Sequence, residues 1–243
     1  MLTHSSQVGP RSQLDHKGTK PTAGQPELGH SDIPRCVAPD GSIVHSGMSS
    51  VWVGGRGGPL HRDNGSLRAQ RWVTENWTYS QQDGTQSTNE TEAGKTERFA
   101  RVLALIFLDE VTALAAGHRP CDVQQSKEAE RFLECWSVKD EGHSKDWAQI
   151  DLILHRERLS EVGRKQTYSS QHQDLPDGSM FQARTGSYLV LGKRSFLWST
   201  RGYAAEASFA PHDIVDVLTP RSVLGVLSAG YGPDIDESIL ALL

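Results

Sequence analysis

The stretch from Phe99 to Cys121 constrains the fold of this chain more than any other part of the sequence. Its first part is strongly apolar, and Ile106-Phe107-Leu108 is the best candidate for a buried strand. Asp109 follows at once and can cap a helix, because its side chain can accept a hydrogen bond from an N–H of the first turn. The helix is expected to run through Ala116, with Gly117 ending it in the left-handed conformation. The segment therefore predicts a buried strand joined directly to a short, Ala-rich helix.

Two more helices and then a series of short strands follow this segment. Ser126 opens a helix to about Val138 whose apolar side chains recur at helical spacing, and Asp146 caps a third helix. After a polar link the pattern changes to short strands, at residues 180–183, 188–191, 194–198 and 215–218. Pro220 fits the first turn of a last helix, which Gly230 ends.

These elements indicate an α+β fold in two parts. Residues 34–165 are expected to form a small mixed unit with about three helices. Residues 174–243 are expected to form a β-rich unit, a β-meander closed by a C-terminal helix.

The beginning of the chain has a different character. Residues 1–33 are rich in Ser, Gly, Pro, Gln and His with only scattered aliphatic residues, so they cannot offset the entropy lost on ordering and should be a disordered tail. A second polar segment, residues 81–95, is expected to be a mobile loop. Early strands are predicted at residues 42–45, 50–53 and 71–79, with a glycine-rich turn at 54–58.

Composition limits the class of protein. The formal net charge is −5, from 25 basic and 30 acidic residues, and gives no overall electrostatic case for nucleic acid. Three cysteines are too few for a disulfide framework and favour a reducing compartment, so we expect a cytoplasmic protein. No secretory signal is visible at the N-terminus, and no apolar run approaches the length of a membrane span, so no membrane partner is expected.

The segment 107–121 resembles the second half of the metal-binding module of Ada-type DNA repair proteins. In that module a strand and a short Ala-rich helix lead into Ala-Gly-aromatic-Arg-Pro-Cys-x-x-Cys, and residues 116–121 here read Ala-Gly-His-Arg-Pro-Cys. The glycine breaks the helix, the proline stiffens the turn, and two thiolates three residues apart approach one tetrahedral zinc ion. The resemblance implies a zinc-knuckle scaffold for this part of the chain.

The chain departs from the Ada-type pattern at the ligands themselves. Gln124 stands where the second thiolate is expected, and an amide is a poor zinc ligand beside thiolate or imidazole. No cysteine occurs between Ser42 and Leu108, although the pattern needs two cysteines upstream of the strand. The candidate metal ligands that remain are Cys36, His61, His118 and Cys121, with Cys135 as a further donor. We therefore expect a degenerate site and no cofactor, with Zn as the alternative. For His118, which stands where the module has an aromatic residue, packing is favoured over ligation.

A longer resemblance is to a group of uncharacterised bacterial proteins that contain this partial motif. In that group a Gly-x-Arg-Gly-x-Leu-His element precedes the Ada-like segment, and residues 55–61 here, Gly-Arg-Gly-Gly-Pro-Leu-His, are similar with one residue inserted. Residues 175–180 and the later motifs Trp198-Ser199, Gly202-Tyr203 and Leu218-Thr219-Pro220 also resemble the group. The likeness runs from about Arg35 to the end of the chain and implies no particular activity.

One local basic cluster stands out: Arg156, Arg158, Arg164 and Lys165. A helix end followed by a basic loop can meet phosphates, so these residues are the candidate nucleic-acid-binding residues. The simpler interpretation, which we favour, is a solvated helix terminus whose cations suit the helix dipole.

Two classes of function remain open. The favoured one is a non-enzymatic binding module, with nucleic acid as its candidate partner, descended from a zinc-knuckle scaffold with a degenerate metal site. The alternative is a metal-dependent or His-based hydrolytic enzyme with a site between the two halves, using His61, His118 or His155 with a carboxylate such as Asp109. No nucleophile elbow or phosphate-binding loop completes a catalytic motif, which favours the binding module.

Overall fold

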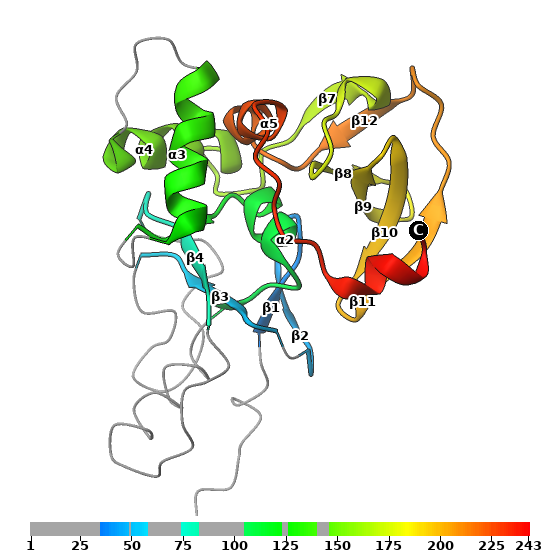
Figure 1. The fold of residues 1–243 in the computed structure, drawn as a ribbon, viewed down its shortest axis with the longest axis horizontal. Helices are drawn as coiled ribbons and strands as arrows, with labels where there is room; N and C mark the ends of the chain where they lie inside the picture. The colour runs from blue at the N-terminus through cyan, green and yellow to red at the C-terminus, as the bar shows by residue number, and fades with distance from the viewer. Residues whose placement is uncertain (1–34, 49, 58–73, 83–104, 123–125, 140–145) are drawn as a thin grey trace, which may run out of the picture. The chain divides into compact units, whose positions relative to one another are not determined.

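This computed structural model describes residues 35–48, 50–57, 74–82, 105–122, 126–139 and 146–243. All of them belong to one compact unit that spans Ser31–Leu243. The described residues form two six-stranded sheets and four α-helices, which confirms the α+β class (Figure 1). The predicted disordered tail at 1–33 and His61 lie outside the described residues, as does the predicted loop beyond Gln82.

The first sheet is mixed. Its strand order is β2-β1-β5-β3-β4-β6, with β1 parallel to β5, β4 parallel to β6 and the other neighbours antiparallel. The strands are β1 (Arg35–Val37), β2 (Ile43–His45), β3 (Trp52–Gly55), β4 (Thr78–Gln81), β5 (Leu105–Ile106) and β6 (Arg119–Pro120). Each is short, so the sheet depends on side-chain packing against the helices as well as on its own ladder.

The second sheet is antiparallel throughout, in the order β11-β10-β9-β8-β12-β7. Its strands are β7 (Tyr168–Gln171), β8 (Met180–Ala183), β9 (Gly186–Leu191), β10 (Arg194–Ser199), β11 (Gly202–Ala207) and β12 (Ile214–Val217). The strands β8, β9, β10 and β12 match the predicted short strands. Two strands were not predicted, β7 and β11, because neither shows the apolar alternation that marks a half-buried strand.

The shortest α-helix connects the two cores. The α-helices are α2 (Glu110–Ala115), α3 (Lys127–Lys139), α4 (Trp147–Arg158) and α5 (Arg221–Ser228), and 3-10 helices occur at η1 (His172–Asp174) and η2 (Glu237–Ala241). Every residue of α2 is buried. Ala113 and Leu114 pack with the first sheet and the larger helices, whereas Val111 and Ala115 pack against the second sheet. A helix with apolar residues all round is expected at such a central position.

The two parts predicted from the sequence share one hydrophobic core. Phe132 and Trp136 of α3 and Ile150 of α4 lie in the same cluster as Val226 of α5 and Tyr231. The C-terminal helix therefore packs on helices of the preceding part and does not only close the meander.

The glycine-rich segment at 54–58 corrects one prediction. Gly54 and Gly55 are not a turn but the end of β3, paired with Tyr79 and Thr78. A Cβ at Gly54 would lie 2.3 Å from the Thr78 carbonyl oxygen and 2.9 Å from Phe107, so the glycine allows close approach of neighbouring strands. The predicted strand at 71–79 is likewise displaced, since β4 begins only at Thr78.

No helix in the described part of the chain is both long and apolar enough to cross a membrane.

Candidate anion-binding pocket

The turn after α2 forms as the sequence predicts. Asp109 caps the helix, because its Oδ1 accepts a 2.8 Å hydrogen bond from the Thr112 amide. Gly117 has φ of +89°, the left-handed conformation that ends a helix without strain only at glycine. The chain then enters β6, where Arg119 pairs with Thr78 of β4. The turn at residues 117–121, which we call the knuckle, thus lies at the edge of the first sheet.

The candidate metal ligands occupy different surroundings. Cys36 is buried in β1 with its Sγ 4.0 Å from the sulfur of Met48, and burial raises the pKa of its thiol to about 12. Cys121 is half-buried, and Cys135 lies on α3 with its Sγ 3.8 Å from the Ala229 carbonyl oxygen. In the described ranges no three His, Cys, Asp or Glu residues are grouped as a metal site would need. His61 lies outside those ranges.

His118 is an aromatic packing residue in this structure. Its ring lies 4.9 Å from that of Trp77 and 4.8 Å from that of Phe107, centroid to centroid, and its side chain is fully buried. Burial lowers the pKa of His118 well below its ordinary value, and the nearby charges of Arg56, Arg158 and Lys165 lower it further. The imidazole is therefore neutral at physiological pH.

Those three cations surround a cavity of about 400 Å³ beside His118, which we call the basic pocket. Its walls come from the β1–β2 turn, the end of β3, the end of α4 and the loop that follows α4. The residues that line it are Asp40, Gly41, Ser42, Arg56, Trp77, Ala116, Arg158, Leu159, Gly163, Arg164 and Lys165. Four basic side chains and a single carboxylate therefore face this cavity.

Arg158 is the most deeply placed of the four. It is fully buried, and its guanidinium donates to the carbonyl oxygens of Gly117 at 2.9 Å and Glu75 at 2.5 Å. Its Nε has no hydrogen-bond partner. Burial lowers the pKa of Arg158 to about 9, although at neutral pH the group still carries its charge.

Arg56 approaches the pocket from the end of β3. Its Nη2 donates to the Gly41 carbonyl oxygen at 2.7 Å. The guanidinium carbons of Arg56 and Arg158 lie 4.1 Å and 4.2 Å from the ring centroid of Trp77, so both make cation–π contacts with one indole. Burial lowers the pKa of Arg56 to about 10.

Lys165, in the loop after α4, also lines the pocket. Its Nζ donates to the Ala115 carbonyl oxygen at 2.5 Å, at the C-terminal end of α2. Burial lowers the pKa of Lys165 to about 7; Asp40 opposes this change, and Arg158 and Arg56 add to it. Arg164 beside it is exposed at the mouth of the cavity.

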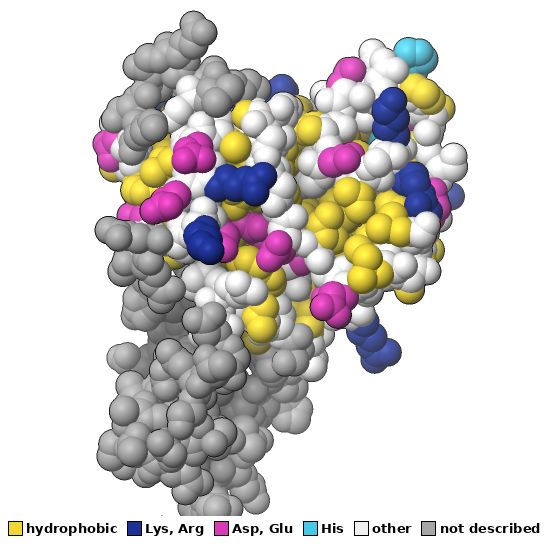
Figure 2. Space-filling view, viewed as in Figure 1, with side chains coloured by type: hydrophobic (Ala, Val, Ile, Leu, Met, Phe, Trp, Pro, Cys, Tyr) yellow, Lys and Arg dark blue, Asp and Glu magenta, His cyan; other side chains and the backbone are white. Residues whose placement is uncertain are grey.

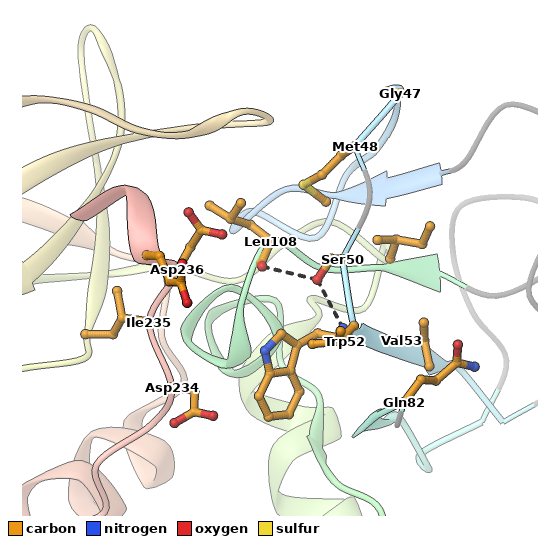
Figure 3. A pocket seen from close by; sticks show the side chains of 13 residues that line it. Gly47, Met48, Ser50, Trp52, Val53, Gln82, Leu108, Asp234, Ile235 and Asp236 are labelled. Atoms are coloured by element: carbon orange, nitrogen blue, oxygen red, sulfur yellow. Dashed lines mark hydrogen bonds between the residues drawn. The ribbon is translucent and has the colours of Figure 1, made fainter. Parts of the chain in front are cut away.

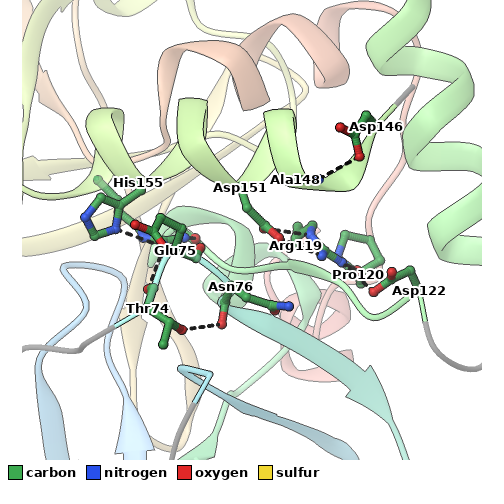
Figure 4. Close-up of polar contacts among 12 residues, drawn as sticks. Thr74, Glu75, Asn76, Arg119, Pro120, Asp122, Asp146, Ala148, Asp151 and His155 are labelled. Atoms are coloured by element: carbon green, nitrogen blue, oxygen red, sulfur yellow. Dashed lines mark hydrogen bonds and ion pairs between the residues drawn. The ribbon is translucent and has the colours of Figure 1, made fainter. Parts of the chain in front are cut away.

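A neighbouring arginine shows the contrasting arrangement. Arg119 is as deeply buried as Arg158, but its Nε and Nη2 donate to the two carboxylate oxygens of Asp151 at 2.8 Å and 2.9 Å (Figure 4). A third bond joins it to Asp122 at 3.0 Å. Among the described residues no ion pair joins Arg158 or Lys165 to a carboxylate. The fold thus pairs one buried arginine with carboxylates, whereas the described contacts of the other are with carbonyl oxygens, the His155 ring nitrogen and the Trp77 ring.

The structure divides the predicted basic cluster. Arg158, Arg164 and Lys165 line the pocket, whereas Arg156 is exposed and is not part of its wall. Two residues apart on a helix, Arg156 and Arg158 face different directions. Arg56 was not predicted as a site residue. It lies in the Gly-x-Arg-Gly element that resembles the group of bacterial proteins, and this element was the sequence feature that could have indicated it.

A second, larger cavity of about 700 Å³ lies near the C-terminal segment (Figure 3). Asp234, Ile235 and Asp236 form one wall, opposite Met48 and Trp52. The wall is fixed from behind by α2, since the backbone amides of Asp234 and Asp236 donate to the carboxylates of Glu110 and Asp109 at 2.8 Å and 3.2 Å. Its charged residues are all acidic, so it is not suited to an anion.

Basic side chains do not gather on the face shown in Figure 2, where lysines and arginines stand apart among acidic residues. Hydrophobic side chains collect there over the second sheet and the C-terminal 3-10 helix, whose Leu240 is 69% exposed. That face therefore offers no positive stripe to a nucleic acid, and the basic pocket is the feature that suits a negative ligand.

Comparison of the chain with family models, curated proteins and solved structures finds no match.

Proposed function

We propose that this chain is a non-enzymatic binding module that holds a negatively charged group of its ligand in the basic pocket. A nucleic acid, through its phosphates, is the partner that we favour. The cysteines of the described segments are free thiols, as in a reducing compartment, so the proposal places the protein in the cytoplasm.

One observation carries the proposal: Arg158 keeps its charge beside the cavity, and among the described residues no ion pair joins it or Lys165 to a carboxylate. A buried charge that is not neutralised is costly, and proteins ordinarily pair it or bind a counter-ion. Arg119, a short distance along the chain, is paired in the ordinary way with Asp151. The described residues supply no such ion pair to Arg158 or Lys165, which is accounted for if an anionic ligand supplies it.

The proposal includes the origin of the scaffold and its metal content. We propose that residues 34–165, with three helices, are an Ada-like unit with a degenerate zinc site, and that 174–243 are a β-rich unit closed by a helix. The described thiols support this, because the Sγ of Cys36 lies against the Met48 sulfur and that of Cys135 against the Ala229 carbonyl oxygen, and neither neighbour is a candidate ligand.

The metal content can be measured directly. We expect purified protein to contain well under one zinc per chain by elemental analysis and to melt at the same temperature with and without a chelator. Stoichiometric zinc, lost together with the fold on chelation, would contradict the degenerate site.

The alternative, a His-based or metal-dependent hydrolase, finds less support from the groups it requires. His118 is fully buried between two aromatic rings. Both oxygens of Asp109 are used, by Thr112 on one side and by Tyr203, at 2.7 Å, on the other. A general base and its carboxylate need access to substrate or water, which these two residues lack.

The binding proposal is tested with a labelled single-stranded oligonucleotide over a series of salt concentrations. We expect affinity to fall with salt, and Arg164→Ala to weaken binding and reduce the slope of log affinity against log salt by about 1. Arg156→Ala is the matched control, an exposed arginine of the same cluster outside the pocket. Equal loss in both variants, or no salt-dependent binding by the unaltered chain, would refute the proposal.

A further inference from the structure

The size of the basic pocket limits what can enter it. At about 400 Å³ it is near the lower end of the range for small-molecule sites, roughly 300–1,000 Å³. Its lining comes from turns and helix ends within one concavity, not from a strand face or a long groove. Such a cavity suits one compact group, whereas an extended single strand needs a groove that follows several nucleotides.

The only aromatic residue in the lining is not available for stacking. Trp77 is 2% exposed, and its ring already contacts two guanidinium groups and the His118 ring. Proteins that bind single strands without sequence preference place open aromatic faces against the bases. The group that enters the pocket is therefore not a base but the anion itself.

The charge of the lining favours a doubly charged anion. Among the described residues that line the pocket, four are basic and one, Asp40, is acidic. An internal phosphodiester carries a single negative charge, whereas a terminal phosphate monoester carries roughly 1.5 to 2 and three acceptor oxygens. The monoester leaves less of the buried positive charge uncompensated.

The donors in the pocket also match a terminal group. Arg158 is fully buried and anchored by carbonyl oxygens, so it contributes its charge from behind the lining and not a free fork. The exposed Arg164 is the arginine whose fork can reach the oxygens of a phosphate. Arg164 lies at the mouth, and the structure shows no hydrogen bond from its side chain to any described residue. The nearby backbone amides of Gly41, Ser42 and Gly163 are already bonded, so the side chains must bind the ligand.

We propose that the basic pocket binds the terminal phosphate monoester of its ligand in preference to internal phosphodiesters. This inference rests on the proposed function, in which the pocket is the site of an anionic ligand, and it adds the chemical class of the group. The same group occurs at the end of a nucleic acid strand, in a mononucleotide and, without its ester, as inorganic phosphate.

The test compares oligonucleotides of one sequence that carry a 5′-phosphate, a 3′-phosphate or only hydroxyl ends, with the full chain. We expect a terminal phosphate to raise affinity by about tenfold or more, the effect of one further charge-assisted hydrogen bond. Inorganic phosphate should compete, and both Arg164→Ala and Lys165→Met should abolish the preference. Arg156→Ala should retain it, and melting curves of each variant establish that it is folded.

The outcomes separate the two proposals. Equal affinity for phosphorylated and hydroxyl-ended oligonucleotides would overturn the monoester inference and leave the nucleic-acid module in place. If no oligonucleotide binds, but inorganic phosphate and a nucleoside monophosphate raise the melting temperature of the unaltered chain and not of Lys165→Met, the inference holds and the nucleic-acid partner is wrong. If none of these ligands binds, both are wrong.

Discussion

Gly117 illustrates how a single residue fixes both a helix end and a functional side chain. Its φ of +89° lies in the region that disfavours a side chain, and a Cβ there would lie 2.7 Å from Cβ and 2.8 Å from Cδ of Arg158. The absence of a side chain thus lets the long stem of Arg158 lie directly against the knuckle. The lack of a Cβ at Gly117 therefore allows both the end of helix α2 and the position of Arg158 in the pocket.

Replacing Gly117 by alanine should destabilise the protein by roughly 2–4 kcal/mol, the sum of left-handed strain and an overpacked contact. Gly230 is a matched control, because its φ is +99° and a Cβ there would meet nothing within 4 Å. Gly230→Ala should cost only about 1 kcal/mol of strain. Denaturant unfolding measures both, and equal losses would show that contact with Arg158 is unimportant.

The lowered pKa of Lys165 should make the stability of the protein depend on pH. The pKa is about 7 in the folded protein and near 10.5 in the unfolded chain, so between these values the unfolded state binds more protons. The free energy of unfolding should therefore rise with pH above 7 through this residue. Asp40, Arg158 and Arg56 are the charged groups that act on it, and the pKa values of the two arginines, about 9 and about 10, lie above that of Lys165.

The measurement compares the unaltered chain with Lys165→Met at pH 7.0 and 8.5, both by urea unfolding. The gain in stability with pH should be smaller in the variant, because methionine has no proton to lose. The same gain in both proteins would mean that Lys165 is not desolvated as the structure indicates.

At the scale of elements, the sequence predicted those that depend on local chemistry. The caps at Asp109 and Asp146 and the left-handed glycine at 117 are determined by neighbouring residues, and each is present. Strands that depend on distant partners were missed. β7 reads Tyr-Ser-Ser-Gln and is a strand because β12 pairs with it, and β6 is only two residues beside β4.

The same distinction applies to the candidate site. Arg158, Arg164 and Lys165 are close in sequence and were recognised together as a basic cluster. Arg56 joins them only because β3 ends beside the loop after α4, and nothing local shows that it does. Arg156 was included because it is near in sequence, although the helix directs it elsewhere.

Glu110, in the first turn of α2, holds the C-terminal segment through hydrogen bonds. Glu110 accepts hydrogen bonds at one carboxylate oxygen from Tyr79, at 2.5 Å, and from Tyr231, while its other oxygen accepts from the Asp234 amide. Burial raises the pKa of Glu110, and these hydrogen bonds oppose that change. The helix start is therefore the anchor of the C-terminal segment.

Tyr231→Phe should cost about 1.5–3 kcal/mol, the usual value of a hydrogen bond to a charged group. Tyr168→Phe is the matched control, since its hydroxyl donates to the neutral carbonyl oxygen of Thr219 at 3.1 Å and should cost about 0.5–1.5 kcal/mol. Denaturant unfolding measures the two losses. A loss for Tyr231→Phe no larger than that of the control would show that the bond to Glu110 adds nothing.

At the scale of the whole molecule, the described parts are tied together in three ways. The cluster around Phe132 includes Val223, Val226 and Tyr231, which come from the far end of the chain. The helix α2 contributes side chains to the cores of both sheets. The carboxylates at its start hold the segment that leads to the C-terminus. A chain so connected should not contain a boundary at which it can be divided.

The protein should therefore unfold in a single cooperative transition, with circular dichroism and tryptophan fluorescence giving the same urea midpoint. Fragments 1–165 and 166–243, produced separately, should each lack a cooperative transition. The first fragment leaves the apolar faces of α3 and α4 uncovered, and the second loses α2 from beneath its sheet. Mixing the fragments should restore part of the native signal, because the surfaces they expose are complementary. Cooperative unfolding of fragment 166–243 alone would instead show that the β-rich part is an independent domain that only rests against the helices.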